Sequence, residues 1–253
     1  MTVRAETLIR APILEELGLV AGFTTRAWGS MAGSHHPLDE QARNRSALAN
    51  ALGFDEVARV RQVHGCDVVR VERLVEPWPV ADAMWTDRAG VLLGIAAADC
   101  VPILVASRDG VVAGAHAGWE GTSRQVATAL VGSLAAAGVS PEELVAWLGP
   151  SIGPCCYTID DERAAVIASR IGDAALMPHA GRVVFDLWEA NAKQLRDAGV
   201  SRIDLAGLCT RSGGADVWSY RGRGADGKYG TQLGFIGRRG GRGPRSAERS
   251  EAS

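Results

Sequence analysis

The sequence predicts an α/β (α+β) fold, a single domain with mixed β-sheets flanked by helices. The stretch GVLLGIAAADCVPILVAS is almost entirely apolar and rich in Val, Ile and Leu, as strands buried on both faces are. Segments such as DERAAVIASRIG have the pattern of helices. Neither an internal repeat nor a Pro/Ser-rich linker divides the chain, so residues 1–237 are expected to form one catalytic domain.

The expected elements follow in order along the chain. Apolar residues near period two predict a strand pair over 57–75, and GVVAGAHAG predicts a further buried strand. The segment WEGTSRQVATALVGSLAAAGVS predicts one helix that ends at Gly138. ELVAWLGPSIGP predicts a strand that leads into a turn. Two more helices, over 161–172 and 186–200, precede late strands in SRIDLAGLCT and TQLGFIG.

The end of the chain has a different composition. Residues 238–253, RRGGRGPRSAERSEAS, are rich in Arg and Gly and contain no aliphatic side chain larger than Ala. Such a segment cannot bury enough apolar surface to order itself. The sequence therefore predicts a disordered tail, with contact to nucleic acid as the alternative use of its arginines.

Composition and charge limit the classes of function. The chain is 253 residues long and 47% hydrophobic, with a formal net charge of -2. This balance argues against a nucleic-acid or membrane-surface binder. The N-terminus lacks a signal peptide's apolar region, and no apolar run is long enough to span a membrane. With five cysteines, an odd number, we expect a reduced, cytoplasmic protein.

Three potential metal ligands stand at the ends of predicted strands: His64 in RQVHG, Cys100 in AADC and His116 in GAHAG. Two imidazoles and a thiolate form a plausible zinc set that leaves a fourth position open, and copper accepts the same ligands. Their spacing matches no local metal motif. A metal-free alternative uses Cys100 as a nucleophile, His116 or His64 as its base, and Asp99 to orient the imidazole.

His116 is surrounded by very small residues. We expect Ala115, Ala117 and Gly118 to keep the approach to its ring open, so that a metal and a planar ligand reach it. Of the other cysteines, the adjacent Cys155 and Cys156 are expected in a structured turn rather than in a vicinal disulfide or a joint metal site.

An ordered set of motifs resembles a known family. The set is GFTTR, NRSAL, QVHG, ADAMWTD, ADCVPILV, HAGWEGT, LGPSIGPCCY, LCT and SYR. It resembles the bacterial YfiH-type laccase-domain proteins, long labelled multicopper polyphenol oxidases and now described as purine nucleoside phosphorylases. The resemblance extends from about Gly22 to Ile236. QVHG, ADC and HAGW in this order are specific together, although each alone is weak.

The resemblance implies a fold, a metal and an activity. The fold would be mixed α/β with a Cys-His geometry similar to that of the necrotizing-factor toxins. His64, Cys100 and His116 would bind zinc. The substrates would be a purine nucleoside (adenosine, inosine, guanosine or methylthioadenosine) and phosphate, with adenosine deamination as a further activity. One branch of the family is also credited with removing wrongly built peptidoglycan precursors.

Phosphorolysis needs cations that hold phosphate, and Arg suits this best. The motif positions suggest Arg26, Arg45 and Arg221 as substrate-binding residues. Gln62 lies two residues before His64 and would share its face of a strand. Asp99 would support the metal ligands or contact the substrate.

The chain also departs from the family pattern. Glu120 stands where the family often has Arg, and the first loop lacks the family's Asn-Leu-Gly and Gly-Asp. These departures affect the phosphate and sugar contacts but leave the metal set intact. Three functions therefore stay open: a zinc-dependent purine nucleoside phosphorylase, a Cys-His hydrolase or amidase, and a copper-dependent polyphenol oxidase. The sequence is consistent with a monomer or a small homo-oligomer.

Overall fold

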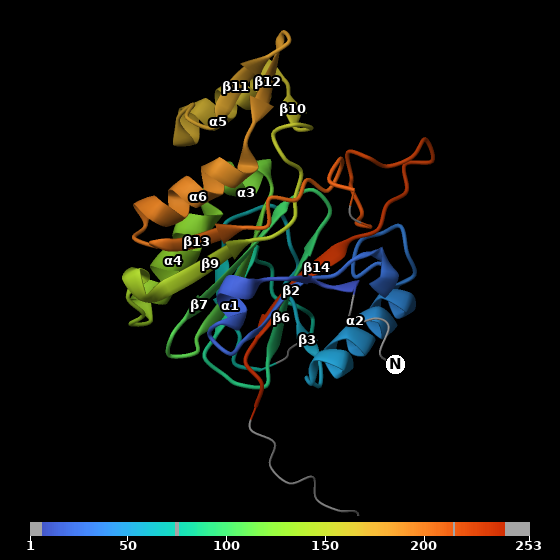
Figure 1. The fold of residues 1–253 in the computed structure, drawn as a ribbon, viewed down its shortest axis with the longest axis vertical. Coiled ribbons are helices and arrows are strands. Elements are labelled where there is room, and N and C mark those ends of the chain that lie inside the picture. Colours follow the sequence, from blue (N-terminus) through green and yellow to red (C-terminus); the bar gives the residue numbers. More distant parts are fainter. Residues whose placement is uncertain (1–6, 74–75, 215, 241–253) are drawn as a thin grey trace, which may run out of the picture.

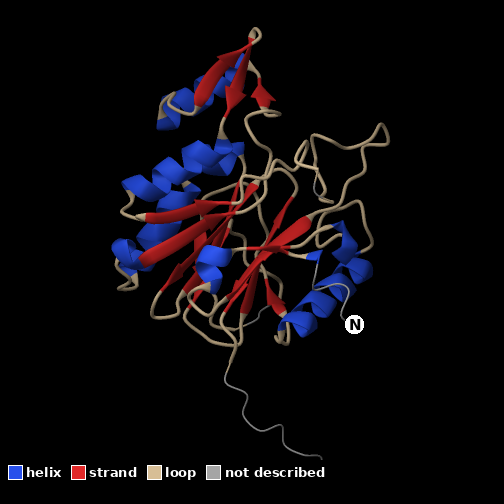
Figure 2. Ribbon diagram, in the orientation of Figure 1, coloured by secondary structure: helices blue, strands red, loops and turns tan. Residues whose placement is uncertain are grey.

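The fold is built from two large β-sheets packed face to face with helices on both outer sides (Figure 1). It is described here from a computed structural model, which places residues 7–73, 76–214 and 216–240. Figure 2 shows the red strands of the two sheets at the centre and the blue helices around them. This arrangement confirms the predicted mixed α/β class.

The six-stranded sheet is mixed. Its strands, in spatial order, are β13 (Arg202–Leu205), β9 (Leu144–Leu148), β7 (Val101–Ser107), β8 (Val112–Ala117), β5 (Ala83–Thr86) and β4 (Val68–Arg70). The two outermost pairs are parallel and the inner pairs are antiparallel.

The five-stranded sheet is mixed as well. Its strands, in spatial order, are β1 (Ile9–Arg10), β2 (Val20–Phe23), β14 (Gln232–Gly237), β6 (Leu92–Ala97) and β3 (Val57–Ala58). β14, the last strand in the chain, pairs with β2 on one side and β6 on the other. The C-terminal strand therefore holds early and middle segments together.

Side-chain alternation along the strands explains the layers. In β7, Val101, Ile103 and Val105 pack under the helices, whereas Leu104 and Ala106 pack between the two sheets. This is the period of two that every strand imposes. The sequence GVLLGIAAADCVPILVAS is apolar throughout because both faces of its strands are covered, as predicted.

Glycine sets how closely the two sheets approach. A Cβ on Gly114 of β8 would lie 2.9 Å from Cγ1 of Ile95 on β6, and one on Gly234 of β14 would lie 2.7 Å from Cβ of Pro102 on β7. Both contacts are closer than carbon atoms tolerate. The glycines therefore let a large side chain from one sheet rest on the backbone of the other.

Helices cover the two outer faces. The helices are α1 (Pro12–Glu15), α2 (Leu38–Leu52), α3 (Trp119–Ser123), α4 (Val126–Ala136), α5 (Asp161–Ile171) and α6 (Leu187–Asp197). α4 and α6 pack on the six-stranded sheet, and α2 covers the five-stranded one. α5 packs with a small antiparallel sheet of β10 (Thr158–Ile159), β12 (Arg182–Phe185) and β11 (Leu176–His179), which projects from the body (Figure 1).

The helix predicted from Trp119 to Gly138 is interrupted. Gln125 adopts the left-handed conformation with φ 62°, and this residue separates α3 from α4. The sequence gives no Gly or Pro at this point, so pattern alone could not place the break. The helices predicted over 161–172 and 186–200 are confirmed as α5 and α6.

The strand pair predicted over 57–75 is mostly loop. Within its described part, residues 57–73, only Val57–Ala58 and Val68–Arg70 are regular strands. Between them, three successive backbone N–H groups point at one buried carboxylate instead of at a neighbouring strand. That carboxylate belongs to the candidate site, which is described in the next subsection.

The predicted tail begins with anchored residues. Arg238 donates to the carbonyl of Asp87, and Arg239 donates to the carbonyl of Leu52. Residues 241–253, the rest of that segment, lie outside the described residues. No helix in the described part of the chain has the length and apolar character needed to cross a membrane.

Candidate metal site and substrate cavity

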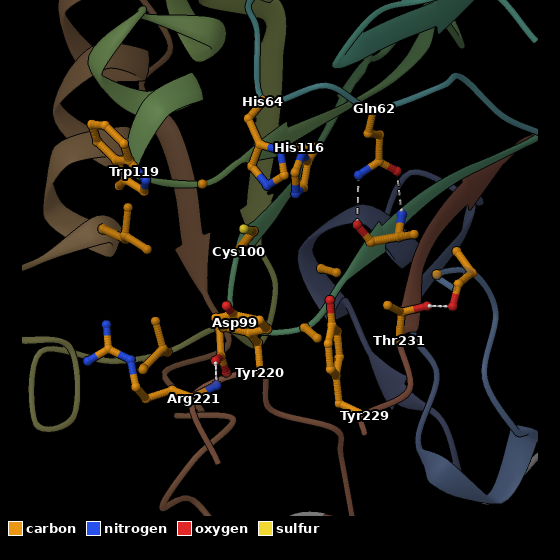
Figure 3. Close-up of a pocket in the computed structure, with 18 of the residues that line it drawn as sticks. Gln62, His64, Asp99, Cys100, His116, Trp119, Tyr220, Arg221, Tyr229 and Thr231 are labelled. Carbon is orange, nitrogen blue, oxygen red and sulfur yellow. Dashed lines mark hydrogen bonds between the residues drawn. The ribbon is translucent and has the colours of Figure 1, made fainter. Parts of the chain in front are cut away.

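A cavity of about 660 Å³ opens at one end of the two sheets. Its floor comes from the β6–β7 connection and from the end of β8, and its walls include the loop that carries His64. The long connection between β13 and β14 contributes Tyr220, Arg221 and Tyr229 (Figure 3). Helix α5, which packs with the small projecting sheet of β10, β12 and β11, adds Arg163.

His64, Cys100 and His116 come together in this cavity. One potential ligand atom of each lies within 4.8 Å of those of the other two. The imidazole rings have centroids 4.8 Å apart at an interplanar angle of 70°. Figure 3 shows the three side chains converging from separate segments of the chain. The predicted set is therefore present as one cluster.

Asp82 organises this cluster. Its carboxylate, which is fully buried, accepts hydrogen bonds from the backbone N–H groups of Val63, His64 and Gly65 at 2.7–3.0 Å. It also accepts from Nδ1 of His116 at 2.9 Å. Because a carboxylate only accepts, Nδ1 carries the proton and Nε2 is left to face the cluster. One side chain thus fixes both histidines.

Two site residues adopt unusual backbone conformations. His64 has φ 62° and Asp99 has φ 86°, a region that residues with a Cβ rarely occupy. Each such residue costs about 1–3 kcal/mol and persists only where its surroundings hold it in place. At His64 the bonds to Asp82 do so. At Asp99 the carboxylate accepts from Thr210 Oγ1 at 2.5 Å and from Arg221 N at 2.6 Å.

The orienting role suggested for Asp99 is wrong. Asp82 holds the imidazole of His116, while both oxygens of Asp99 are engaged with the connection that precedes β14. Asp99 is adjacent in sequence to Cys100 and lines the same cavity. Its bonds therefore fix the backbone from which Cys100 projects.

The small residues around His116 do not act together as predicted. Ala115 and Ala117 lie in the core beneath the helices, on the opposite face of β8 from the ring, because side chains alternate along a strand. Gly118 does matter. A Cβ there would lie 2.8 Å from Cys100 Sγ and 3.2 Å from His64 Cδ2. The missing side chain at Gly118 therefore leaves room for the side chains of Cys100 and His64.

Charge in the cluster favours a thiolate. Burial raises the pKa of the Cys100 thiol, but the charge of His116 and hydrogen bonds from both imidazoles lower it to about 6. Burial lowers the pKa of His116, but Cys100 and Asp82 outweigh this and raise it to about 9. The metal-free site is thus a thiolate–imidazolium pair at neutral pH.

This pair leads to a pH prediction. In protein treated with a chelator, the alkylation rate of Cys100 by iodoacetamide should be half-maximal near pH 6 and level above pH 7. Peptide-resolved mass spectrometry measures the rate. In His116→Asn the midpoint should move above about pH 8, because the stabilising charge is gone. A wild-type rate that keeps rising to pH 9 would contradict the ion pair.

The predicted substrate-binding residues divide into two groups. Gln62 and Arg221 line the cavity, although the amide of Gln62 is bonded to both the N–H and the carbonyl of Ala96. Arg221 also donates to the carbonyl of Thr158. Arg26 and Arg45 are not among the lining residues of this cavity, and they donate to the carbonyls of Val217 and Met31.

Comparison with known proteins places the chain in a family. A family model described as multi-copper polyphenol oxidoreductase laccase matches residues 20–239. The chain belongs to this laccase-domain family. The YfiH-type resemblance drawn from the motifs is thereby confirmed.

Relatives of this laccase-domain chain are named as enzymes. It is 38% identical over 234 residues to a purine nucleoside phosphorylase of Deinococcus radiodurans, with 87% of this chain and 89% of the relative covered. It is 32% identical over 198 residues to the purine nucleoside phosphorylase YfiH of Escherichia coli, with 76% and 79% covered.

Solved structures agree with the fold. YlmD from Geobacillus stearothermophilus superposes with a TM-score of 0.81 at 32% identity, covering 92% of this chain and 97% of that one. The YfiH protein of Bacillus licheniformis superposes with a TM-score of 0.78 at 28% identity, covering 88% and 93%. Over the covered residues, the architecture is therefore that of YlmD and YfiH.

The donor set of this laccase-domain site fits a metal ion. Two nitrogens and a sulfur within 4.8 Å of one another suit zinc or copper, and the carboxylate behind His116 is a typical partner of a metal-bound imidazole. The fourth position would be open to the cavity.

Pattern reasoning missed Asp82 and Arg59. Asp82 lies in the motif ADAMWTD, and Arg59 lies in the segment interpreted as a strand. Arg59 lines the cavity, its guanidinium lies 4.4 Å from the ring of Trp78, and its Nε is buried without a hydrogen-bond partner among the described residues. Glu120, a departure from the family motif, pairs with Arg124 in the same turn.

Proposed function

We propose that this protein is a purine nucleoside phosphorylase that holds one zinc ion on His64, Cys100 and His116. The observation that carries the proposal is the placement of that cluster in a cavity that is also lined by Arg59, a half-buried cation. The names of the relatives support the reaction, and the donor set supports the metal. When bound, zinc would supply a Lewis acid at the open side of the cluster.

Arg59 would bind the phosphate. Burial and the neighbouring charge of Arg45 lower its pKa to about 10, so it remains a cation at neutral pH. A guanidinium that lines the cavity is well suited to an incoming oxyanion. This reassigns to Arg59 the role that motif matching gave to Arg26 and Arg45. Arg221 is the predicted arginine that lines the same cavity.

Aromatic residues would hold the nucleoside. Tyr157, Tyr220, Tyr229 and Trp119 line the cavity and offer faces on which a purine stacks. Burial raises the pKa of Tyr157 to about 12, so its hydroxyl stays a hydrogen-bond donor. In the reaction a phosphate oxygen forms a bond to the ribose C1′ and the purine leaves with the electrons of the glycosidic bond. The leaving base would accept a hydrogen bond from a neutral phenol.

Deamination is the weaker assignment for this site. Zinc deaminases use a carboxylate that carries protons beside the metal. Asp99 is the one carboxylate among the described residues that line the cavity, and both its oxygens are already bonded. We therefore propose phosphorolysis of purine nucleosides as the principal activity and adenosine deamination as a minor one.

The deciding assay follows base release from inosine and adenosine with zinc, in the presence and absence of phosphate. Release should require phosphate and should be lost in Cys100→Ser. Phosphate-independent release would replace the proposal with a hydrolase. Activity that persists after complete removal of metal would favour a Cys100–His116 thiol enzyme.

Arg59→Ala should raise the KM for phosphate by about 10- to 100-fold, because a charge-assisted hydrogen bond contributes about 1.5–3 kcal/mol. The KM for inosine should change far less. Steady-state kinetics with each substrate varied separate the two effects. Arg43→Ala is the matched control, because Arg43 is exposed and pairs with Asp39 on α2. An unchanged phosphate KM in Arg59→Ala would rule out this role.

A further inference from the structure

A second group of cysteines lies outside the candidate active site. Cys155 and Cys156 occupy the turn that follows β9, and Cys209 lies in the connection that follows β13. The two segments are joined by a parallel bridge between Ser151 and Cys209. All three cysteines are free thiols, ranging from exposed Cys155 to buried Cys209.

Their sulfur atoms converge despite the adjacency of Cys155 and Cys156. The Sγ atoms of these two lie 3.7 Å apart, and all three Sγ atoms lie within 4.8 Å of one another. Around a tetrahedral ion with metal–sulfur bonds of about 2.3 Å, neighbouring sulfurs lie about 3.8 Å apart. The expectation that adjacent cysteines cannot share a metal therefore does not fit this turn.

Polar groups contact two of the three sulfurs. The backbone N–H of Gly153 donates to Cys209 Sγ at 3.3 Å, and Ser212 Oγ lies 3.4 Å from Cys155 Sγ. A hydrogen-bond donor to sulfur stabilises the thiolate form. Thiolates are the form in which cysteine binds metal ions.

We propose that Cys155, Cys156 and Cys209 form a second metal site, which takes one thiophilic cation such as Zn²⁺. The three sulfurs supply three ligands, and Ser212 or water completes the coordination. Three soft donors at this spacing favour zinc over oxygen-seeking cations such as Mg²⁺.

Such an ion would support the candidate active site mechanically. Thr210, next to Cys209, donates to Asp99, and Ile152 N donates to the carbonyl of Asp99. Both segments that supply the thiols therefore hold the residue that precedes Cys100. An ion bound to the three sulfurs would tie these segments together behind the cavity.

Cadmium is the probe, because a cadmium–thiolate bond gives an ultraviolet charge-transfer band. The experiment uses full-length Cys100→Ser under reducing conditions, so that the first set is disabled. We expect binding of about one equivalent of Cd²⁺ with the band of several thiolates. Adding Cys155→Ser, at an exposed position that folding tolerates, should weaken binding at least about tenfold. Adding Cys66→Ser, at a cysteine outside the group, should leave binding unchanged.

Two results would overturn the proposal. One is Cys100→Ser protein that shows no cadmium band although its thiols are reduced. The other is a band that survives both Cys155→Ser and Cys209→Ser. As a second readout, Zn²⁺ should protect Cys155 of the Cys100→Ser protein from alkylation, and unprotected labelling at saturating Zn²⁺ would also count against the site. Nucleoside turnover enters none of these measurements, so they stand apart from the test of the phosphorylase activity.

Discussion

Asp82→Ala is expected to lower the free energy of unfolding by about 3 kcal/mol or more and to weaken metal binding by at least about tenfold. The substitution removes the acceptor of four hydrogen bonds at a fully buried position. It leaves three backbone N–H groups unpaired and His116 without a partner for Nδ1. Because His64 is held in a left-handed conformation by the same carboxylate, its ring would also lose its position.

Chemical denaturation and chelator competition measure the two effects of Asp82→Ala. Asp82→Asn should cause smaller losses of stability and of metal affinity than Asp82→Ala. The amide keeps one acceptor oxygen, but its NH₂ group faces N–H donors. Asp87→Asn is the matched control, because Asp87 is an exposed carboxylate that pairs with Arg70. A destabilisation of Asp82→Ala no larger than that of the control would show that Asp82 does not organise the site.

The same carboxylate makes stability depend on acid. Burial raises the pKa of Asp82, but the bonds from His116, Gly65 and Val63 lower it to about 2. A carboxyl with a depressed folded-state pKa stabilises the protein above its unfolded value of about 3.9. That contribution should disappear as pH falls from about 4 to 2, and Asp82→Asn should lack this part of the loss in equilibrium unfolding measured over the same range.

Gly118→Ala is expected to reduce metal occupancy of the proposed site and its turnover by at least about tenfold while leaving the fold intact. Gly118 has φ −78° and ψ −179°, which any residue adopts, so the backbone is not strained by the change. The added Cβ would lie 2.8 Å from Cys100 Sγ, and the thiol must turn away from both histidines. The effect therefore comes from one methyl group placed against the ligands.

Metal analysis of the purified variant, thermal unfolding and base release test this expectation for Gly118→Ala. Gly132→Ala makes the same chemical change within α4, where a Cβ meets nothing within 4 Å. That control should retain full activity and gain about 0.5–1 kcal/mol of stability from its helical position. Equal metal content in wild type and Gly118→Ala would mean that the space beside Cys100 is not needed.

Two members of the candidate metal cluster, Cys100 and His116, could be predicted because they stand at strand ends. The register of β7 and β8 pairs Val101 with Ala117 and Pro102 with His116. Cys100 and His116 are therefore neighbours as soon as the two buried segments form an antiparallel pair. His64 was expected at the end of a strand as well, but in the structure it lies in a loop.

Asp82 and Arg59 could not be predicted in the same way. Asp82 reaches His116 because β5 pairs with β8 with Ala83 opposite Ala115, a contact between distant segments that no local pattern reveals. Arg59 alternates with the apolar residues Ala58 and Val60, a pattern that is also typical of the solvent side of a strand. The motif positions of Arg26 and Arg45 suggest phosphate contacts, yet the guanidinium groups of both residues donate to backbone carbonyls. Whether an arginine holds the chain or a ligand depends on which carbonyls lie nearby.

The cavity is lined partly by residues on or next to regular strands and partly by residues of an irregular connection. Cys100, His116 and Asp82 lie on or next to strands of the six-stranded sheet, whereas Tyr220, Arg221 and Tyr229 belong to the irregular connection between β13 and β14. Loops accept substitutions and insertions that a sheet core does not. Mutations in this connection can therefore alter which substrate the proposed phosphorylase accepts without disturbing the candidate metal ligands. Members of this family could therefore evolve different substrate preferences while they inherit the same candidate metal site.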